Sequence, residues 1–299
     1  MSGRTDNPHI SIVIPTYNHA RFLRTAIDSI CAQTFADWEA LIINNFSEDD
    51  TIVVVESYDD PRIKLVNFAN HGIIAAARNH GLSLTRAPLV AFLDSDDFWY
   101  PEKLQLCIDK VAQGYDLVCH AEAWVGPGER RHNAHYGRNA RATYEGLLLD
   151  GNCISTSAVM VRREWLERAG GFSIQPDFVT AEDYELWLKL ARDGAKIGFI
   201  DEVLGEYLIH EHNNSRDPLR NMRAVMAVCE HHFSAIQSNM PPWRTHRRKA
   251  SILYSGARAL QQSGEHRKAI CLYLRAILKW PWILKFYVAM LMSLVHIRC

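Results

Sequence analysis

The sequence lacks the paired cysteines of a disulfide-rich or zinc-finger protein. Its seven cysteines stand singly, with no CxxC pair, and full pairing would leave one over. This usage is typical of a reduced compartment. The polar start, MSGRTDNPH, leads directly into a strand-like run, so we expect no export signal and a cytoplasmic catalytic domain.

An excess of charge of one sign is also missing. The chain has 33 Lys and Arg against 34 Asp and Glu, and 48% of its residues are hydrophobic. This composition is that of a globular protein, and we expect no nucleic-acid partner. The chain has no GxGxxG fingerprint, which excludes a dinucleotide-dependent dehydrogenase. With 299 residues, it has room for one large domain and a smaller appendage.

Short β-branched runs alternate with helical patterns in the first part of the chain. The runs ISIVI, ALII and LVAFL, at residues 10–14, 40–43 and 89–93, have the composition of strands covered on both faces. Helical spacing between the first two predicts an α/β sheet. Ligands of such sheets collect beyond the carboxyl ends of the strands. The loops PTYN, NNFSEDD and DSDD are therefore expected to converge.

The second part of the chain has no strand pattern. From Arg220 to Cys299 the sequence predicts helices, with breaks at Pro241–Pro242 and Gly264. We expect a catalytic domain over residues 1–218 and a helical extension over residues 219–299. The polar stretch from Gly126 to Thr143 is interpreted as a mobile loop.

The final predicted helix, WILKFYVAMLMSLVHI, has about sixteen residues, fewer than the roughly 20 needed to span a bilayer. Lys285 and His296 lie within it, and further Lys and Arg precede it. Two interpretations stay open: a helix lying on an anionic membrane surface, and a core helix of a small bundle.

Three carboxylates follow the third buried strand. Asp94, Asp96 and Asp97 repel one another, and a compact cation between them would relieve that repulsion. Oxygen ligands favour Mg²⁺ or Mn²⁺, which would neutralise a departing diphosphate. The alternative is an acidic turn before a helix that starts near Pro101.

Other polar residues occupy neighbouring loops. Arg78 has the fork of donors that binds a carboxylate or phosphate, or else it forms a surface ion pair. Asn44 and Asn45 carry amides suited to a nucleobase edge, or to an Asx turn. Later in the chain, Asp183 at a helix start is a candidate general base. A helix cap with Thr180 is the competing interpretation.

His210 ends a strand in YLIHEHNNS and is a candidate third metal ligand. His212 is an alternative ligand in the same segment, and a structural role for a lone histidine stays open.

The order and spacing of SIVIPTYNHA, WEALIINNFSEDDT, AAARNHG, LVAFLDSDDFW, AEDYELWLKL and YLIHEHNNS resemble the family 2 glycosyltransferases. The similarity runs from about Ile10 to Ser215. It implies the GT-A fold: a Rossmann-like mixed sheet flanked by helices, here with an all-helical C-terminal extension. By this resemblance Asp183 deprotonates the acceptor, and Asp94 and Asp96 form the DxD motif that holds the nucleotide diphosphate and the metal, with His210 as the candidate third ligand. The resemblance also implies a set of nucleotide-sugar-binding residues: Pro15, Thr16, Tyr17, Asn44, Arg78, Asp94, Ser95 and Glu182.

The implied reaction is the inverting transfer of a sugar from a UDP-, dTDP- or GDP-sugar to a hydroxyl of a glycan or lipid-linked acceptor. Cell-surface polysaccharide assembly is the implied setting, with Mn²⁺ or Mg²⁺ as cofactor. The basic helical tail adds the expectation of a peripheral position on the inner membrane face. The polar loop at 126–143 is expected to close over the donor.

The chain departs from the family pattern at Asn44, where Asp is usual, and at Leu208, where Arg is usual. A non-catalytic nucleotide-sugar-binding scaffold is therefore kept as an alternative. A DxD phosphohydrolase is opposed by Asp97, Phe98 and Trp99, because those enzymes need Thr or Val soon after the second Asp.

Overall fold

The computed structural model describes residues 7–137, 141–210, 217–236 and 240–297. The chain divides into two compact units. The first consists of Met1–Leu147, Asn152–Ile174 and Leu186–His210, and the second of Leu148–Gly151, Gln175–Glu185 and Glu211–Cys299. The domain division expected at residues 218 and 219 stays a prediction.

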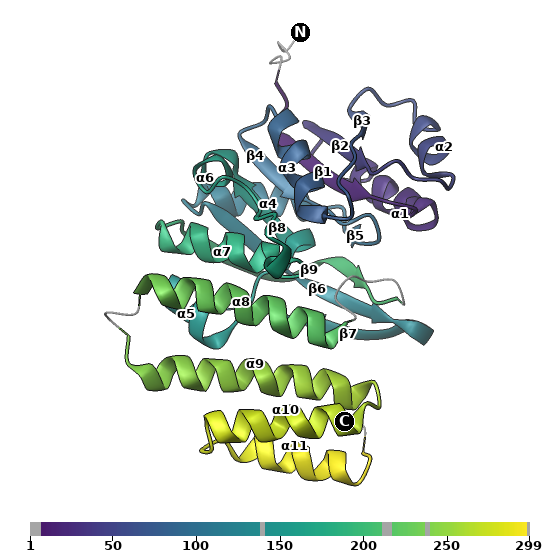
Figure 1. Cartoon of the computed structure of the whole chain (residues 1–299). Coiled ribbons are helices and arrows are strands. Elements are labelled where there is room, and N and C mark those ends of the chain that lie inside the picture. Colours follow the sequence, from purple (N-terminus) through teal and green to yellow (C-terminus); the bar gives the residue numbers. More distant parts are fainter. Residues whose placement is uncertain (1–6, 138–140, 211–216, 237–239, 298–299) are drawn as a thin grey trace. The chain divides into compact units, whose positions relative to one another are not determined.

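The first unit is built on one mixed sheet (Figure 1). Its strands follow the order β3-β2-β1-β4-β8-β6-β9-β5, and β7 pairs with β6. The first four in this order are parallel to one another, and β8 pairs antiparallel with both β4 and β6. The strands are β1 (Ile10–Thr16), β2 (Trp38–Asn44), β3 (Ile63–Asn67), β4 (Leu89–Phe92), β5 (Phe98–Trp99), β6 (Leu117–Gly126), β7 (Arg130–Ala134), β8 (Val159–Arg162) and β9 (Ile197–Leu208).

Helices flank this sheet, as the sequence predicts. They are α1 (Ala20–Cys31), α2 (Thr51–Glu56), α3 (Ile74–Leu84), α4 (Lys103–Ala112) and α6 (Arg163–Arg168), while α5 (Tyr144–Asp150) and α7 (Glu182–Arg192) each contribute to both units. Helix α1 buries Leu23, Ala26, Ile27 and Ile30, the residues that share one helical face. Helix α3 lies so close to β1 that a Cβ at Gly81 would come 2.4 Å from Cγ1 of Val13. A side chain at that position would therefore push the helix from the sheet.

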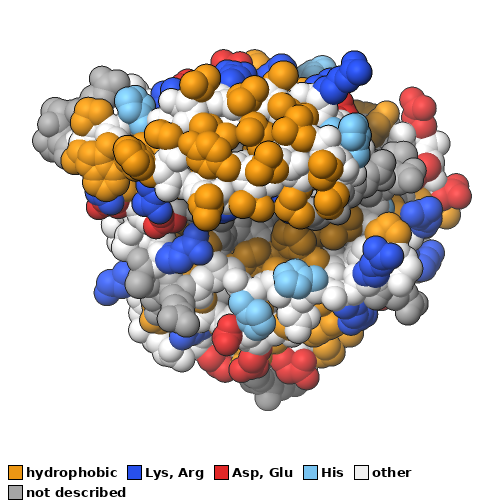
Figure 2. Space-filling model, turned by 90° about the horizontal axis from the view of Figure 1, so that it is seen from below, with side chains coloured by type: hydrophobic (Ala, Val, Ile, Leu, Met, Phe, Trp, Pro, Cys, Tyr) orange, Lys and Arg blue, Asp and Glu red, His pale blue; other side chains and the backbone are white. Residues whose placement is uncertain are grey.

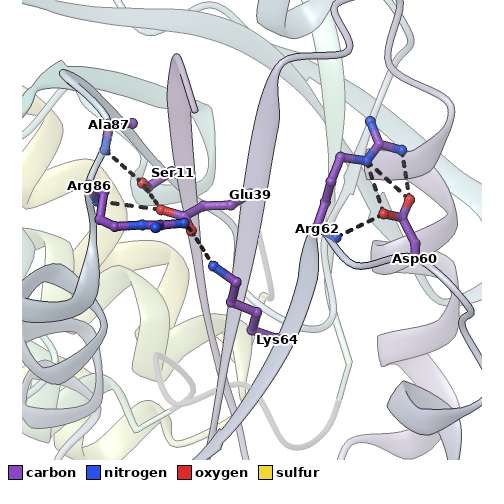
Figure 3. A network of polar contacts seen from close by, with 7 residues as sticks. All are labelled: Ser11, Glu39, Asp60, Arg62, Lys64, Arg86 and Ala87. Carbon is purple, nitrogen blue, oxygen red and sulfur yellow. Dashed lines mark hydrogen bonds and ion pairs between the residues drawn. The ribbon is translucent and has the colours of Figure 1, made fainter. Parts of the chain in front are cut away.

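A buried carboxylate joins the first three strands. Glu39 on β2 accepts hydrogen bonds from the Ser11 hydroxyl at 2.7 Å and from the Lys64 ammonium at 2.8 Å, and Arg86 lies 3.5 Å away (Figure 3). Burial alone would raise the pKa of Glu39, but these donors hold it below its usual value. Because Glu39 is ionised in the fold, the contacts of β1, β2 and β3 depend on this charge.

The expectation of a loop across Gly126 to Thr143 was wrong in part. A short 3₁₀ turn, η1 (Pro127–Glu129), leads into β7, which pairs antiparallel with β6 and places His132 opposite Trp124. Gly128 has a φ of 73°, which glycine adopts without strain. Polar residues form this strand because ribbon pairing uses backbone hydrogen bonds, and exposed side chains need not be apolar.

The second unit consists mainly of helices. After the 3₁₀ turn η4 (Pro176–Phe178) come α8 (Pro218–Ile236), α9 (Pro242–Gln262), α10 (His266–Lys279) and α11 (Leu284–Leu294). The breaks predicted at Pro241–Pro242 and Gly264 are confirmed, and Gly264 has a φ of 84°. Leu253, Leu260, Tyr273 and Phe286 belong to the core that α9, α10 and α11 share.

The last helix is shorter than its apolar sequence predicts. Helix α11 has eleven residues, because the turn around Pro281 delays its start to Leu284. Among the residues described, no helix is both long and apolar enough to cross a membrane. Phe286, Ala289 and Ser293 are buried, so this helix packs through one face.

Candidate functional site

The carboxyl ends of β1, β2 and β4 meet at one edge of the sheet. Thr16 pairs with Asn44 in the register of β1 and β2, and Leu93 after β4 donates its backbone N–H to Val13. The structure thus brings the loops that follow Thr16 and Asn44 beside the acidic segment that starts at Asp94. This is the convergence that the sequence predicts.

Arg78 binds the first of the acidic residues. Its guanidinium Nη2 lies 2.7 Å from Oδ1 of Asp94, and only 4% of the arginine side chain is exposed. The guanidinium carbon lies 5.4 Å from the ring centre of Phe172. Arg78 is therefore a fixed, buried cation beside the end of β4, and not the surface ion pair that was the alternative.

Asp96 contacts His210 from the end of β9. Nε2 of the histidine lies 2.7 Å from Oδ2 of Asp96, and the imidazole stacks on Phe22 with ring centres 4.7 Å apart. Burial and the neighbouring Asp94 raise the pKa of Asp96, while His210 opposes that rise. This carboxylate thus occupies a site with surplus negative charge.

Two of the residues predicted at this edge are almost fully buried. The Ser95 hydroxyl is 2.8 Å from Nδ1 of His19, a residue that the sequence reasoning missed. Burial lowers the pKa of His19, so its neutral form is favoured. Thr16 is 5% exposed, and its Oγ1 has no hydrogen-bond partner among the described residues. Such an orphaned hydroxyl beside Asn44 is available to a polar ligand.

Asp97 is the buried aspartate of the acidic segment, and its carboxylate links that segment to two other parts of the chain. It is buried, its Oδ2 accepts the Ser157 hydroxyl at 2.5 Å, and its Oδ1 accepts the backbone N–H of Leu208 at 3.1 Å. Burial and the charge of Asp96 hold the pKa of Asp97 well above its usual value. Because Leu208 lies two residues before His210, Asp97 fixes the strand end that presents the histidine.

The amide of Asn44 is already engaged. Its Nδ2 donates to Oδ1 of Asn67 at 2.7 Å, and its Oδ1 accepts from the Ser47 hydroxyl at 2.6 Å. Asn45 accepts the backbone N–H of Asn70 at 3.0 Å. In this structure both amides thus shape the loop, as in the Asx-turn interpretation.

Two aromatic side chains lie exposed on neighbouring loops. Tyr17, after the buried Pro15, is 50% exposed, and Phe46 is 59% exposed with a φ of 53°. Their loops are joined by the hydrogen bond from the Asn18 backbone N–H to the Ser47 hydroxyl, at 2.9 Å. Phe46 therefore has a left-handed backbone conformation, which favours glycine.

Glu182 and Asp183 belong to the second unit, in the first turn of α7. The carboxylate that receives the Thr180 backbone N–H is that of Glu182, at 2.8 Å. Asp183 accepts the N–H of Tyr184 at 2.6 Å, and its side chain is half-buried. The capping contact predicted for Asp183 with Thr180 is thus made by its neighbour. His212, the alternative metal ligand, lies outside the described residues.

Among the residues described, no group of three His, Cys, Asp or Glu is arranged as a preformed metal site. The donors nonetheless fit a divalent cation in kind, since Asp94 and Asp96 supply carboxylate oxygens and His210 supplies an imidazole. Burial, and after it the neighbouring Asp94, raise the pKa of Asp96, so a cation bound here would favour its ionised form. A bound cation would take the place of the contact that Asp96 now makes with His210.

Comparison with known proteins decides the family. Residues 11–170 match the model for "Glycosyl transferase family 2". The chain belongs to this family. This glycosyltransferase is 32% identical over 192 residues to the UDP-Glc:alpha-D-GlcNAc-diphosphoundecaprenol beta-1,3-glucosyltransferase WfgD of Escherichia coli, covering 63% of the chain and 72% of the relative.

Two solved structures show that the family 2 glycosyltransferase has the GT-A fold. TarS 1–349 of S. aureus, in complex with UDP-GlcNAc, has a TM-score of 0.66 at 16% identity and covers 96% of this chain and 87% of that one. Mannosyltransferase PcManGT from Pyrobaculum calidifontis, in complex with GDP-Man and Mn²⁺, has a TM-score of 0.62 at 19% identity, with coverages of 98% and 86%. The predicted fold class is confirmed, and the phosphohydrolase alternative is set aside.

Proposed function

We propose that this glycosyltransferase moves a sugar from a nucleoside diphosphate sugar to a hydroxyl acceptor with inversion at the anomeric carbon. The observation that carries the proposal is the arrangement at the end of β4, where Asp94 meets Arg78 and Asp96 meets His210. The site therefore holds two carboxylates that can bind a cation, an arginine that supplies positive charge, and an imidazole that can bind a metal. A site for a metal and a diphosphate requires groups of these kinds. The named ligands of the two solved relatives, UDP-GlcNAc and GDP-Man, support a donor of this class.

The donor's nucleoside is assigned to the loops after β1 and β2. Tyr17 and Phe46 offer exposed rings on which a base can stack, and the unpartnered Thr16 hydroxyl offers a hydrogen bond. Asn44 shapes the loop after β2 through its hydrogen bonds with Asn67 and Ser47. Replacement of the family's usual Asp by Asn44 is therefore compatible with donor binding.

A divalent cation, Mn²⁺ or Mg²⁺, is assigned to Asp94, Asp96 and His210. When bound, it would supply positive charge to the departing diphosphate. Arg78 holds Asp94 in place through a buried ion pair, and Asp97 holds the strand end that carries His210. The PcManGT structure, which contains Mn²⁺, supports a metal in this fold.

Asp183 is assigned as the general base that takes the proton of the acceptor hydroxyl. The family resemblance supports this role, and Glu182 supports the turn by binding the Thr180 backbone N–H. The acceptor is proposed to be a glycan or a lipid-linked sugar in cell-surface polysaccharide assembly, on the cytoplasmic side. The name of the relative WfgD, which contains a diphosphoundecaprenol acceptor, supports the lipid-linked class.

The test is a donor screen by thermal shift, with and without Mn²⁺, followed by turnover assays of the donor that binds. A true donor and its metal should raise the melting temperature together, because both bind only the folded state. Asp183→Asn should retain this joint shift and lose at least about 100-fold in transfer rate. Asp201→Asn is the matched control, since Asp201 is 93% exposed.

The non-catalytic scaffold makes a different prediction. It requires that the wild type binds the donor but neither transfers nor hydrolyses its sugar. Wild type and Asp183→Asn should then have the same donor-induced thermal shift and the same absence of turnover. Binding that ignores added cation for every common sugar nucleotide would overturn the metal assignment.

A further inference from the structure

The two last helices expose a continuous apolar surface. On α11 and at its C-cap, Leu284, Val288, Leu291 and Val295 follow the spacing i, i+4, i+7 and i+11, and all four are exposed. In Figure 2 hydrophobic side chains gather on the face seen from below, with Lys and Arg side chains at the edges. We call this surface the C-terminal apolar face, and it includes Leu278, Trp282, Leu284, Val288 and Leu291.

The most exposed residues of this face lie at the turn between α10 and α11. Leu278 is 84% exposed, Trp282 80% and Leu284 76%. These are large side chains that a soluble monomer normally buries or scatters singly. The turn itself is supported, because Trp280 stacks on Trp243 with ring centres 6.2 Å apart. The apolar side chains thus project from a fixed turn.

The charge around the face has one sign. Residues 266–297 contain no Asp or Glu, and they contain five Lys or Arg: Arg267, Lys268, Arg275, Lys279 and Lys285. All five are exposed. At the start of α10, Lys268 forms an ion pair with Glu265, so the uncompensated charge lies toward the turn. Lys279 and Lys285 border the apolar turn on its two sides in the sequence.

Exposed apolar side chains bordered by positive charge favour one kind of partner for the C-terminal apolar face over others. A second copy docked symmetrically on the same face would bring its own positive charges against these. A protein partner's interface core is usually depleted in lysine. Trp and Leu bordered by Lys and Arg are the pattern of segments that lie in a membrane interface. Helix α11 has eleven residues, so it lies on a bilayer and does not cross it.

We propose that the C-terminal apolar face docks onto a lipid bilayer with anionic headgroups. Leu278, Trp282 and Leu284 enter the interface, while Lys279 and Lys285 bind headgroup phosphates. The proposal is independent of the donor, the metal and the general base assigned above. It is measured by vesicle binding, whereas sugar transfer is measured by donor binding and turnover. A negative result for one proposal therefore does not contradict the other.

The experiment is co-sedimentation of the full chain with vesicles of phosphatidylcholine alone, or of phosphatidylcholine in which one third is replaced by phosphatidylglycerol. The wild type should bind the anionic vesicles, and added salt should weaken the binding as it screens the headgroups. The combined substitution Leu278→Ser, Trp282→Ser and Leu284→Ser should lower the partition coefficient at least about tenfold. Because these side chains are exposed, the variant should keep the wild-type melting temperature.

A second variant tests the charge. Lys279→Gln with Lys285→Gln should lower the partition coefficient by about 25-fold, roughly fivefold for each removed charge. The matched controls are Val53→Ser, at a side chain that is 65% exposed on α2, and Arg168→Glu, at one that is 63% exposed on α6. Both controls should bind vesicles as the wild type does.

Three results would overturn the proposal. The first is absence of binding to anionic vesicles, and the second is binding that the serine and glutamine variants leave unchanged. The third is a concentration-dependent dimer, seen by light scattering, that the triple serine variant abolishes, since the face would then be covered by a second copy.

Discussion

Nε2 of His210 lies 2.7 Å from Oδ2 of Asp96, although the two residues are 114 positions apart in the sequence. The contact joins the end of β9 to the segment after β4, so the metal assignment depends on strands from distant parts of the chain. The imidazole also stacks on Phe22 of α1. His210 is thus held in place before any ligand arrives.

His210→Ala is expected to weaken cation binding by about 10- to 100-fold, because one ligand and the partner of Asp96 are lost together. The measurement is a titration of Mn²⁺ in the presence of donor, followed by the melting temperature. His132→Ala, at an exposed residue of β7, is the control. If His210→Ala responds to Mn²⁺ as the wild type does, His210 is not a ligand.

Glu39→Gln is expected to destabilise the fold at neutral pH. The donors Ser11 and Lys64 hold the pKa of Glu39 below its unfolded value, so its contribution is present above the unfolded pKa of about 4.3 and is lost as the pH falls through the folded pKa. Urea unfolding should show a loss of roughly 1–2 kcal/mol at pH 7, after allowance for the partly exposed lysine.

The difference in free energy of unfolding between wild type and Glu39→Gln should shrink as the pH falls below about 4.3. Glu164→Gln is the comparison, since its side chain is 57% exposed and lies 3.5 Å from Arg168. That change should cost less than about 0.5 kcal/mol. A constant difference between wild type and Glu39→Gln across this pH range would contradict the linkage.

Glu122→Gln is expected to stabilise the fold at alkaline pH. Burial raises the pKa of Glu122 to about 7, against the hydrogen bond from Tyr136. A raised folded pKa favours the protonated carboxyl, so the wild type loses stability as the pH rises from the unfolded pKa of about 4.3 through about 7. The variant carries no such charge.

The measurement is urea unfolding at about pH 4 and at about pH 8, where the variant should gain roughly 1–3 kcal/mol at the higher value only. Glu202→Gln, at an exposed residue of β9, should show no gain at either pH. An equal gain of Glu122→Gln at both pH values would mean that packing, and not ionisation, is responsible.

The sheet and its binding edge could be predicted because their signals are local. Continuous apolar runs identify β1, β2 and β4, and the spacing of Leu23, Ile27 and Ile30 identifies the buried face of α1. The carboxyl-end rule then places Thr16, Asn44 and Asp94 together. Each of these steps uses residues within one element or one connection.

Other features depend on partners that the sequence does not pair. Asp97 is bound by Ser157 and Leu208, which lie 60 and 111 positions away, so its supporting role had no local signal. Strand β7 has a polar composition and follows a short turn, so its sequence pattern predicts a loop. His19 had one available clue, its place directly after the first strand's turn.

Residues 266–297 contain no Asp or Glu, so this segment and the rest of the chain have net charges of opposite sign. Because the whole sequence has one more acidic than basic residue, everything outside this segment has an acidic surplus of six. If the chain docks as proposed, an anionic bilayer would attract residues 266–297 and repel the remainder before any contact forms. Long-range steering of this kind would make the molecule arrive with this segment first, at a rate that rises as the ionic strength falls.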